Sequence, residues 1–249
     1  MFSGAAPASA DAGDKPVLAV TFENAKGEKG RLFLNGKGLS RVELDRHHAH
    51  YLLLDLKRPE AWMVDMGRRQ VTSGQALLFS GTHVPLSVVD EGEGPERLDA
   101  GTRRFSVRDM DGRHCASYLV SPSLPARDER LRQTGQFLSR LAVSPREILP
   151  ALGPLAGGLI SSCLRAELDA LPQLVTAGLP VERANAKGKV TFRVSDVTER
   201  DALDQCLLTL PAGYAVRTPA QVALEAIRVR LFGKDSPKTD ELRLDQCPP

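Results

Sequence analysis

Three imidazoles lie within four residues of the sequence, at His47, His48 and His50. Imidazole nitrogens bind zinc, copper and nickel, so this segment is the strongest candidate for metal chemistry in the chain. Alternate side chains of a β-strand point to the same face, so His48 and His50 could bind one ion together while His47 points away. The candidates for a third ligand are Asp45, His83 and His114, and Met63 or Met66 could complete a copper site.

The same histidines also suit a second interpretation. Asp45 and Arg46 precede them, and a polar segment of this kind is typical of an exposed start of a strand. Metal binding depends on the geometry of the site rather than on residue types, so the sequence leaves both interpretations open.

Other reactive side chains lack the neighbours that catalysis needs. The sequence contains no G-x-S-x-G, P-loop or H-E-x-x-H motif. Ser161 and Ser162 have no base placed beside them, and Gly92 and Gly94 lie among carboxylates that would repel a phosphate group. We therefore expect a protein that is not an enzyme and that uses no cofactor.

The four cysteines, Cys115, Cys163, Cys206 and Cys247, are far apart, and none forms a C-x-x-C pair. This spacing argues against a zinc site and against a thioredoxin-type motif. An even number suits two disulfides, which persist in oxidising compartments. Three pairings are possible; we favour Cys115–Cys163 and Cys206–Cys247, and four buried free thiols are the alternative.

The first residues of the chain also bear on its location. Residues 1–16 are rich in Ala, Ser, Gly and Pro, and Ala8-Ser9-Ala10 is similar to the small-residue region at a signal-peptide cleavage site. Together with the cysteines, this segment predicts a periplasmic or secreted protein. A disordered tail of a cytosolic protein is the alternative.

Composition excludes two classes of partner. No stretch of about 18 apolar residues occurs, so we expect no transmembrane segment. The net charge is only +2, from 33 basic and 31 acidic residues, and aromatic residues make up 5% of the chain. Neither value favours binding to nucleic acid, which needs a basic surface and often stacking side chains.

Strand-like patterns fill residues 17–120. Apolar and polar side chains alternate there between turns that contain glycine, which predicts an antiparallel meander. The expected strands are 17–23, 31–35, 39–44, 50–56, 61–66, a short one between Gly67 and Gly74, 75–80, 103–109 and 113–120, and the acidic residues 90–102 are expected to form a loop.

The pattern changes after Ser121. Helical spacing of apolar residues, or a capping signal such as Ser144-Pro145-Arg146-Glu147, predicts helices in the next part of the chain. The expected elements are helices at 127–141, from Ser144 onward and at 159–171, strands at 179–184 and 189–197, and a final helix at 219–231.

Helices that are segregated along the chain predict an α+β fold, with one large, curved antiparallel sheet and helices on one face. We expect residues 1–16 to be a disordered remnant, 17–232 a single domain and 233–249 a tail. If the helices cover the sheet only in part, an apolar cavity results; a filled core is the alternative. The side chains expected on the helix-facing side are Leu52, Leu54, Trp62, Val64, Phe105, Val107, Phe192 and Val194.

Several short segments resemble one known family. They are Tyr51-Leu-Leu-Leu-Asp-Leu, Trp62-Met-Val-Asp-Met, Gly178-Leu-Pro-Val-Glu-Arg, Gly188-Lys-Val-Thr-Phe-Arg-Val and Leu210-Pro-Ala-Gly-Tyr. Over residues 17–216 the chain is similar to bacterial secreted domains of unknown function that resemble periplasmic lipoprotein carriers of the LolA type. This resemblance implies a half-barrel sheet, closed by helices around an apolar cavity for a lipid or acyl chain.

These observations lead to one expected function and two alternatives. The resemblance implies a non-enzymatic periplasmic protein that binds a lipid or a lipoprotein acyl chain between its sheet and its helices. The first alternative is an envelope protein-interaction or assembly module with a filled core. The second is a periplasmic metal-binding protein that uses the region His47–His50.

Overall fold

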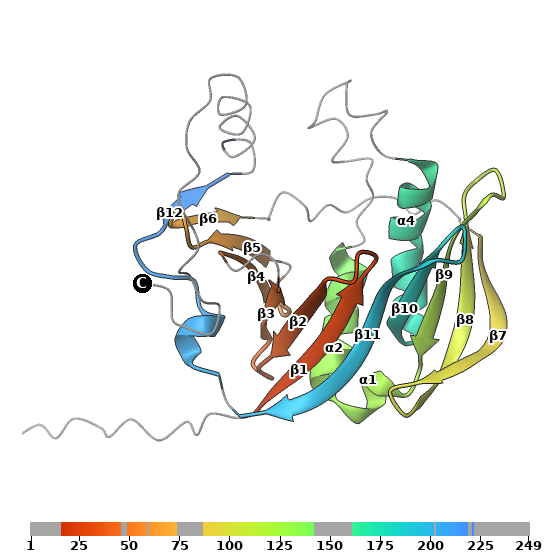
Figure 1. Ribbon diagram of the computed structural model, residues 1–249, viewed down its shortest axis with the longest axis horizontal. Helices are drawn as coiled ribbons and strands as arrows, with labels where there is room; N and C mark the ends of the chain where they lie inside the picture. Colours follow the sequence, from red (N-terminus) through yellow and green to blue (C-terminus); the bar gives the residue numbers. More distant parts are fainter. Residues whose placement is uncertain are drawn as a thin grey trace, which may run out of the picture.

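The computed structural model describes residues 16–45, 49–58, 60–73, 87–141, 161–201, 203–218 and 221. Within these residues, one twelve-stranded sheet dominates the molecule (Figure 1). Its strand order is β12-β6-β5-β4-β3-β2-β1-β11-β10-β9-β8-β7, and only β12 pairs in parallel, with β6. The sheet is open, because β12 and β7 lie at opposite edges. The expected α+β class with a large antiparallel sheet is confirmed at this level.

The first six strands form a meander whose turns are set by local chemistry. The side-chain oxygens of Asn24 and Asn35 each accept two backbone N–H groups, at 2.9 and 3.1 Å. Gly27 and Gly36 follow with φ of 75° and 68°, which glycine adopts without strain. The strands are β1 (Val17–Asn24), β2 (Lys29–Leu34), β3 (Leu39–Leu44), β4 (His50–Asp55), β5 (Glu60–Asp65) and β6 (Gln70–Ser73).

The second part of the sheet joins the first where β11 pairs with β1. Its strands are β7 (Ser87–Arg97), β8 (Ala100–Arg108), β9 (His114–Ser121), β10 (Leu179–Asn185) and β11 (Val190–Arg200), and the short strand β12 (Ala215–Arg217) lies beyond β6. The expected strand 75–80 lies outside the described residues.

The prediction of a loop at residues 90–102 is wrong. This segment supplies most of β7 and the start of β8, which form a hairpin. Strand β7 lies at the edge of the sheet and its side chains are mostly exposed, so it lacks the apolar alternation that reveals a strand. An ion pair between Asp90 and Arg103 (2.6 Å) and the cross-strand backbone pairing hold it in place.

The described helices are α1 (Leu124–Arg127), α2 (Glu129–Leu141), α4 (Ser162–Ala177) and the short 3₁₀ helix η2 (Gln205–Leu208). Helix α4 begins after Ser161, whose hydroxyl accepts the N–H of Leu164 at 3.1 Å, and it continues through Pro172 to Gly178. It is therefore shifted towards the C-terminus relative to the expected 159–171. The helix expected from Ser144 lies outside the described residues, as does 219–231 apart from Gln221.

Helices α2 and α4 lie on one face of the sheet, here called the helix face (Figure 1). Helix α4 packs on β8, β9 and β10, and its Ala166, Ala170 and Leu174 are buried against Phe105 and Val120. Tyr118 donates a hydrogen bond of 2.7 Å to Glu167 of α4, which fixes the helix to the sheet.

Helix α2 extends this core towards β1. Its Leu131 and Phe137 join a cluster of buried apolar residues with Leu18, Val181 and Val194. The two helices thus cover the middle and one side of the helix face.

The opposite face, here called the far face, is covered over β1–β6 by the segment 203–217. Leu208 packs on Val17 and Phe33, and Tyr214 joins a buried cluster with Tyr51 and Val64. The two halves of the sheet are therefore covered on opposite faces, because the chain returns to the first half only after β11.

A buried ion pair fastens this returning segment. The side chain of Arg41 is 1% exposed and donates to Glu43 at 2.8 Å and to the carbonyl of Leu207 at 3.0 Å. Its guanidinium also lies 3.8 Å from the centre of the Tyr51 ring, a cation–π contact.

A partly buried ion pair ties the start of α2 to the strands and predicts an acid-sensitive contribution to stability. Arg130 donates to the carboxylate of Asp128 and also to Glu199 of β11 at 2.9 Å. The hydrogen bonds from the Arg130 guanidinium outweigh partial burial and hold the pKa of Asp128 below its usual range. The ionised carboxylate therefore stabilises the folded state.

An unfolded Asp titrates near pH 4, so this stabilisation is complete above about pH 4 and is lost as the pH falls through the lower folded value. We expect Asp128→Asn to reduce the free energy of unfolding by about 1–2 kcal/mol at neutral pH. The loss should be smaller near about pH 3 than at neutral pH. Urea denaturation of the variant and the wild type at these two pH values measures the difference. An equal loss at both would contradict this role.

Candidate functional site

The helix face of β3, β4 and β5 carries an apolar hollow of about 460 Å³. Val42, Leu52 and Met63 form its centre, because the strand register places them side by side on three adjacent strands. Leu44 and His50 extend the lining. Leu52 is 40% exposed and Met63 39% exposed, so large apolar side chains face solvent at this place.

An unusual strand pattern produces this hollow. Strand β4 contains the apolar run Tyr51 to Leu54 rather than an alternation of apolar and polar residues. Leu53 lies on the far face and is 3% exposed, while its neighbour Leu52 points to the helix face. A run of apolar residues makes both faces of a strand apolar, and here the structure covers only one of them fully.

One end of the hollow is polar. The imidazole of His50 lies 3.2 Å from the carboxylate of Asp65, and Arg68 lies 3.8 Å from the same carboxylate. His50 is 44% exposed through its side chain. Its position suits contact with a polar group of a molecule in the hollow.

The eight apolar residues that the sequence predicts for one side do not share one face. Trp62 and Val64 lie on the far face, because Trp62 pairs with Leu53 and alternate residues of a strand point to opposite faces. We predicted that Trp62 and Val64 of β5 face the helices, but they lie on the far face and pack in one cluster with Tyr214. The other six side chains, Leu52, Leu54, Phe105, Val107, Phe192 and Val194, lie on the helix face.

Most of these six are part of the packed core. Phe105 and Val107 are buried under α4, and Val194 is buried in the cluster that contains Phe137 of α2. Leu54 and Phe192 pack against that cluster. Leu52 alone lines the hollow.

Four lining residues, Val42, Leu44, Tyr51 and Met63, were not among the apolar residues that the sequence predicted for the ligand site. Val42 and Leu44 alternate with polar residues in the expected strand 39–44, and this alternation is the signal that could have identified them. Met63 carried no such signal, because only the register with β4 places it opposite Leu52.

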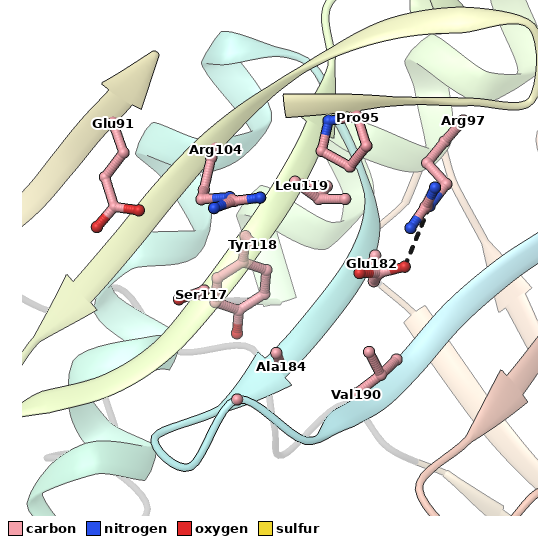
Figure 2. A pocket seen from close by; sticks show the side chains of 11 residues that line it. Glu91, Pro95, Arg97, Arg104, Ser117, Tyr118, Leu119, Glu182, Ala184 and Val190 are labelled. Carbon is pink, nitrogen blue, oxygen red and sulfur yellow. Dashed lines mark hydrogen bonds and ion pairs between the residues drawn. The ribbon is translucent and has the colours of Figure 1, made fainter. Parts of the chain in front are cut away.

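A second hollow, of about 340 Å³, lies on the far face of β7–β11 (Figure 2). Its walls carry the charged side chains of Glu91, Arg97, Arg104 and Glu182 around an apolar floor at Leu119. This second hollow is called the polar cradle below.

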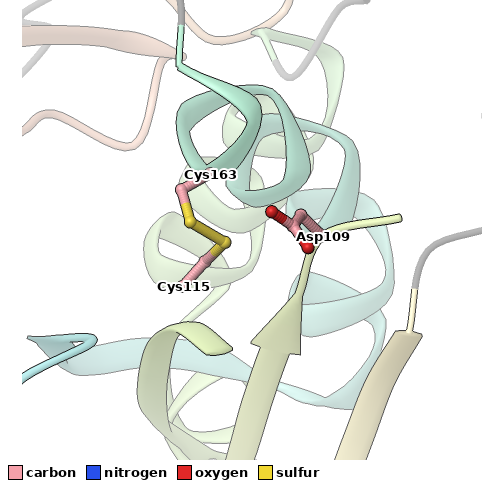
Figure 3. Close-up of side chains that lie close together, drawn as sticks. All are labelled: Asp109, Cys115 and Cys163. Carbon is pink, nitrogen blue, oxygen red and sulfur yellow. A yellow bond between two sulfur atoms is a disulfide. The ribbon is translucent and has the colours of Figure 1, made fainter. Parts of the chain in front are cut away.

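The disulfide Cys115–Cys163 links β9 to the first turn of α4, as the sequence favours (Figure 3). Asp109 lies beside it, and this group is where the described residues bring three potential metal ligands within 4.8 Å. Both sulfur atoms are used in the disulfide, so they cannot act as thiolate ligands. Cys206 is also disulfide-bonded, whereas Cys247, its expected partner, lies outside the described residues.

Asp109 has a structural role instead. Its carboxylate accepts the Ser162 hydroxyl at 3.0 Å and the backbone N–H groups of Arg113 and Asp111 at 2.9 and 3.1 Å. Burial raises the pKa of Asp109, but these hydrogen bonds outweigh it and the net pKa is lowered. The ionised carboxylate therefore holds the start of α4 next to the β8–β9 turn.

The histidines proposed as metal ligands are separated. His50 lies on β4, and His114 lies on β9, six positions away in the strand order of an open sheet. His114 is close to Ser117 (3.3 Å) instead. His47, His48 and His83 lie outside the described residues, and His50 pairs with Asp65, which the sequence analysis did not propose as a ligand.

Comparisons with known proteins add no family to these observations. No protein-family model matches this chain, and no curated protein sequence matches it. Among the described residues, no helix is long and apolar enough to cross a membrane. The function is therefore argued from the geometry of this chain.

Proposed function

We propose that this protein is a non-enzymatic periplasmic or secreted protein that binds an acyl chain of a lipid or lipoprotein in the apolar hollow of β3–β5. One observation carries the proposal: Leu52 and Met63, both large and apolar, are about two-fifths exposed side by side over a hollow of about 460 Å³. This volume lies in the range of about 300–1,000 Å³ that is typical of small-molecule sites.

The lining determines which ligand suits the hollow. Val42, Leu44, Leu52 and Met63 offer no hydrogen-bonding side chains, and the neighbouring backbone groups are paired within the sheet. A ligand with polar groups along its length would lose its hydrogen bonds to water without replacement. An acyl chain loses none, and its polar end can lie beside His50.

The disulfide supports the proposed periplasmic or secreted location. A disulfide such as Cys115–Cys163 persists in an oxidising compartment such as the periplasm or the cell exterior. The resemblance to LolA-type carriers implies the same compartment and the same class of ligand.

Leu52→Arg should weaken the binding of a fluorescent fatty acid by about tenfold or more. Burial of a leucine side chain contributes about 1.5–3 kcal/mol, and the guanidinium would also have to be desolvated. Met110→Arg is the matched control, because Met110 is 77% exposed in the turn between β8 and β9. Fluorescence titration of both variants measures the effect, and native mass spectrometry checks for bound lipid.

Two outcomes would contradict the proposal. One is a wild-type protein that binds no acyl probe and carries no lipid mass. The other is equal binding by Leu52→Arg, Met110→Arg and the wild type. If Leu52→Arg instead turns an oligomer into a monomer in light scattering, with no probe bound by any form, the hollow belongs to a protein interface.

A further inference from the structure

A row of charged and apolar side chains crosses the far face on four adjacent strands. The register aligns Arg104 of β8, Leu119 of β9, Glu182 of β10 and Arg193 of β11. Adjacent strands are about 4.8 Å apart, so Arg104 and Glu182 are separated by about 10 Å across Leu119. In the structure the carboxylate of Glu182 pairs with Arg97 and Arg193 rather than with Arg104.

The carboxylate of the row pairs with two other arginines. Glu182 is 9% exposed, and its Oε2 atom accepts Arg193 at 2.7 Å and Arg97 at 3.2 Å. Arg104, in contrast, has no hydrogen bond or ion pair with any residue that the structure describes. Figure 2 shows its guanidinium extending towards Leu119, away from Glu91. One cation in the polar cradle is therefore available to a ligand.

The wall of the polar cradle is built by irregular pairing of β7. The register with β8 shifts between Asp90 and Gly92 and again between Gly94 and Arg97. Such bulges bend a strand and increase its twist. They bring Pro95 and Arg97 of the edge strand over the floor formed by β8 and β9 (Figure 2). Bulges are common next to binding sites, where they redirect side chains.

Small residues on one side of the polar cradle leave its volume unfilled. Ser117, Ala184 and Gly188 line the side of the cradle that faces the β10–β11 turn. Gly188 is exposed, and an extra Cβ atom there would meet no atom within 4 Å, so the cradle is open to solvent at this end. Leu119 and Val190 contribute apolar surface to the lining.

We propose that the polar cradle is a second binding site, for a small carboxylate that carries an apolar body. The planar guanidinium of Arg104 presents a fork that matches the two oxygens of a carboxylate. Leu119, Pro95 and Val190 would contact the apolar body of the ligand. The four charged side chains that line the cradle, those of Glu91, Arg97, Arg104 and Glu182, balance in formal charge, and Arg193 adds one positive charge from the neighbouring strand. This site is independent of the apolar hollow and of the function proposed for it.

Benzoate is a suitable probe, and benzamide is its neutral counterpart of similar shape. Titration of isotope-labelled full-length protein with benzoate should shift the amide resonances of Ser117, Leu119 and Val190, while benzamide should shift them little. Arg104→Gln should weaken benzoate binding at least tenfold, because it removes the charge and one side of the fork. Arg200→Gln is the matched control, because Arg200 is exposed and lies at the end of β11 remote from Val190, and its side chain has no hydrogen bond or ion pair with any described residue.

Each outcome decides the proposal. Weaker benzoate binding by Arg104→Gln, with Arg200→Gln like the wild type, supports it. Equal weakening by both variants would show that benzoate responds only to the net charge of the protein, and this result would overturn the proposal. The absence of benzoate-induced shifts in the wild type would also overturn it. Shifts with inorganic phosphate but not with benzoate would show an oxyanion site of another class and would also overturn it. Circular dichroism of both variants checks that the fold is retained.

Discussion

Replacement of Glu43 by Ala should lower the free energy of unfolding by about 3–5 kcal/mol, because it leaves the buried guanidinium of Arg41 without its carboxylate. The Arg41 side chain is 1% exposed and that of Glu43 is 6% exposed. Urea denaturation followed by far-ultraviolet circular dichroism measures the loss. Glu93→Ala in the exposed strand β7 is the control, and we expect it to change stability by about 0.5 kcal/mol or less.

The size of this effect follows from desolvation rather than from a strong attraction. Burial raises the pKa of Glu43 and lowers the pKa of Arg41, and in each case it outweighs the attraction of the partner. The pair therefore contributes little net stability, whereas an unpaired member is costly. A double variant, Arg41→Met with Glu43→Met, should recover most of the loss.

The two single variants should also differ. Without Glu43, Arg41 loses its buried carboxylate but keeps contacts such as the Leu207 carbonyl and the ring of Tyr51, which carry no formal charge. Without Arg41, Glu43 keeps Arg31, which lies 3.3 Å away and is about half exposed. Arg41→Met should therefore cost less than Glu43→Ala. A double variant whose loss equals the sum of the two single losses would contradict the explanation.

Removal of the disulfide Cys115–Cys163 should cost about 4 kcal/mol. The two cysteines are 48 residues apart, and the entropy of closing a loop of this length in the unfolded chain corresponds to about this value. We expect the variant Cys115→Ala with Cys163→Ala to show a lower urea midpoint. The start of α4 would retain the hydrogen bond between Ser162 and Asp109, so the helix should still form.

A reductant provides the control for this prediction. Dithiothreitol should lower the stability of the wild type by at least this amount, because it also reduces the disulfide of Cys206, and it should affect the double variant less. Equal stability of the oxidised wild type and the double variant would show that this disulfide is not a stabilising feature. It would also weaken the argument for an oxidising compartment.

Much of the first half of the fold could be predicted from local patterns. The turns at Asn24 and Asn35 have their own hydrogen bonds, and the strands between them alternate in burial, so the first five expected strands agree with the structure within about two residues. Strand β7 could not be predicted, because an exposed edge strand buries neither face and so shows no alternation.

The sequence predicted only some of the residues that form the candidate site. Leu52 was identified, because it lies in a strongly apolar strand. Trp62 was assigned to the same side, but the register places it opposite Leu53 on the far face. Strand registers depend on contacts between segments that are distant in the sequence, and a shift of one residue exchanges the two faces.

By itself, the amino-acid sequence determined that this chain forms an antiparallel sheet with segregated helices, since alternation and turn residues act over a few neighbours. It left three cysteine pairings open, of which we favoured the one with Cys115–Cys163, and the structure shows this disulfide. Only the tertiary structure decided which face of each strand is covered. Helices α2 and α4 cover one face of β8–β11, while the segment after β11 returns to cover the other face of β1–β6.

Both candidate sites lie where the helices and the segment after β11 leave part of a sheet face uncovered. Leu52 and Met63 remain exposed because no described helix packs over them, and Arg104 remains unpaired because Glu182 is bound by Arg97 and Arg193. Neither property belongs to a residue type or to a local pattern. Each arises from what the rest of the chain places beside the residue, which is why it became visible only in the folded protein.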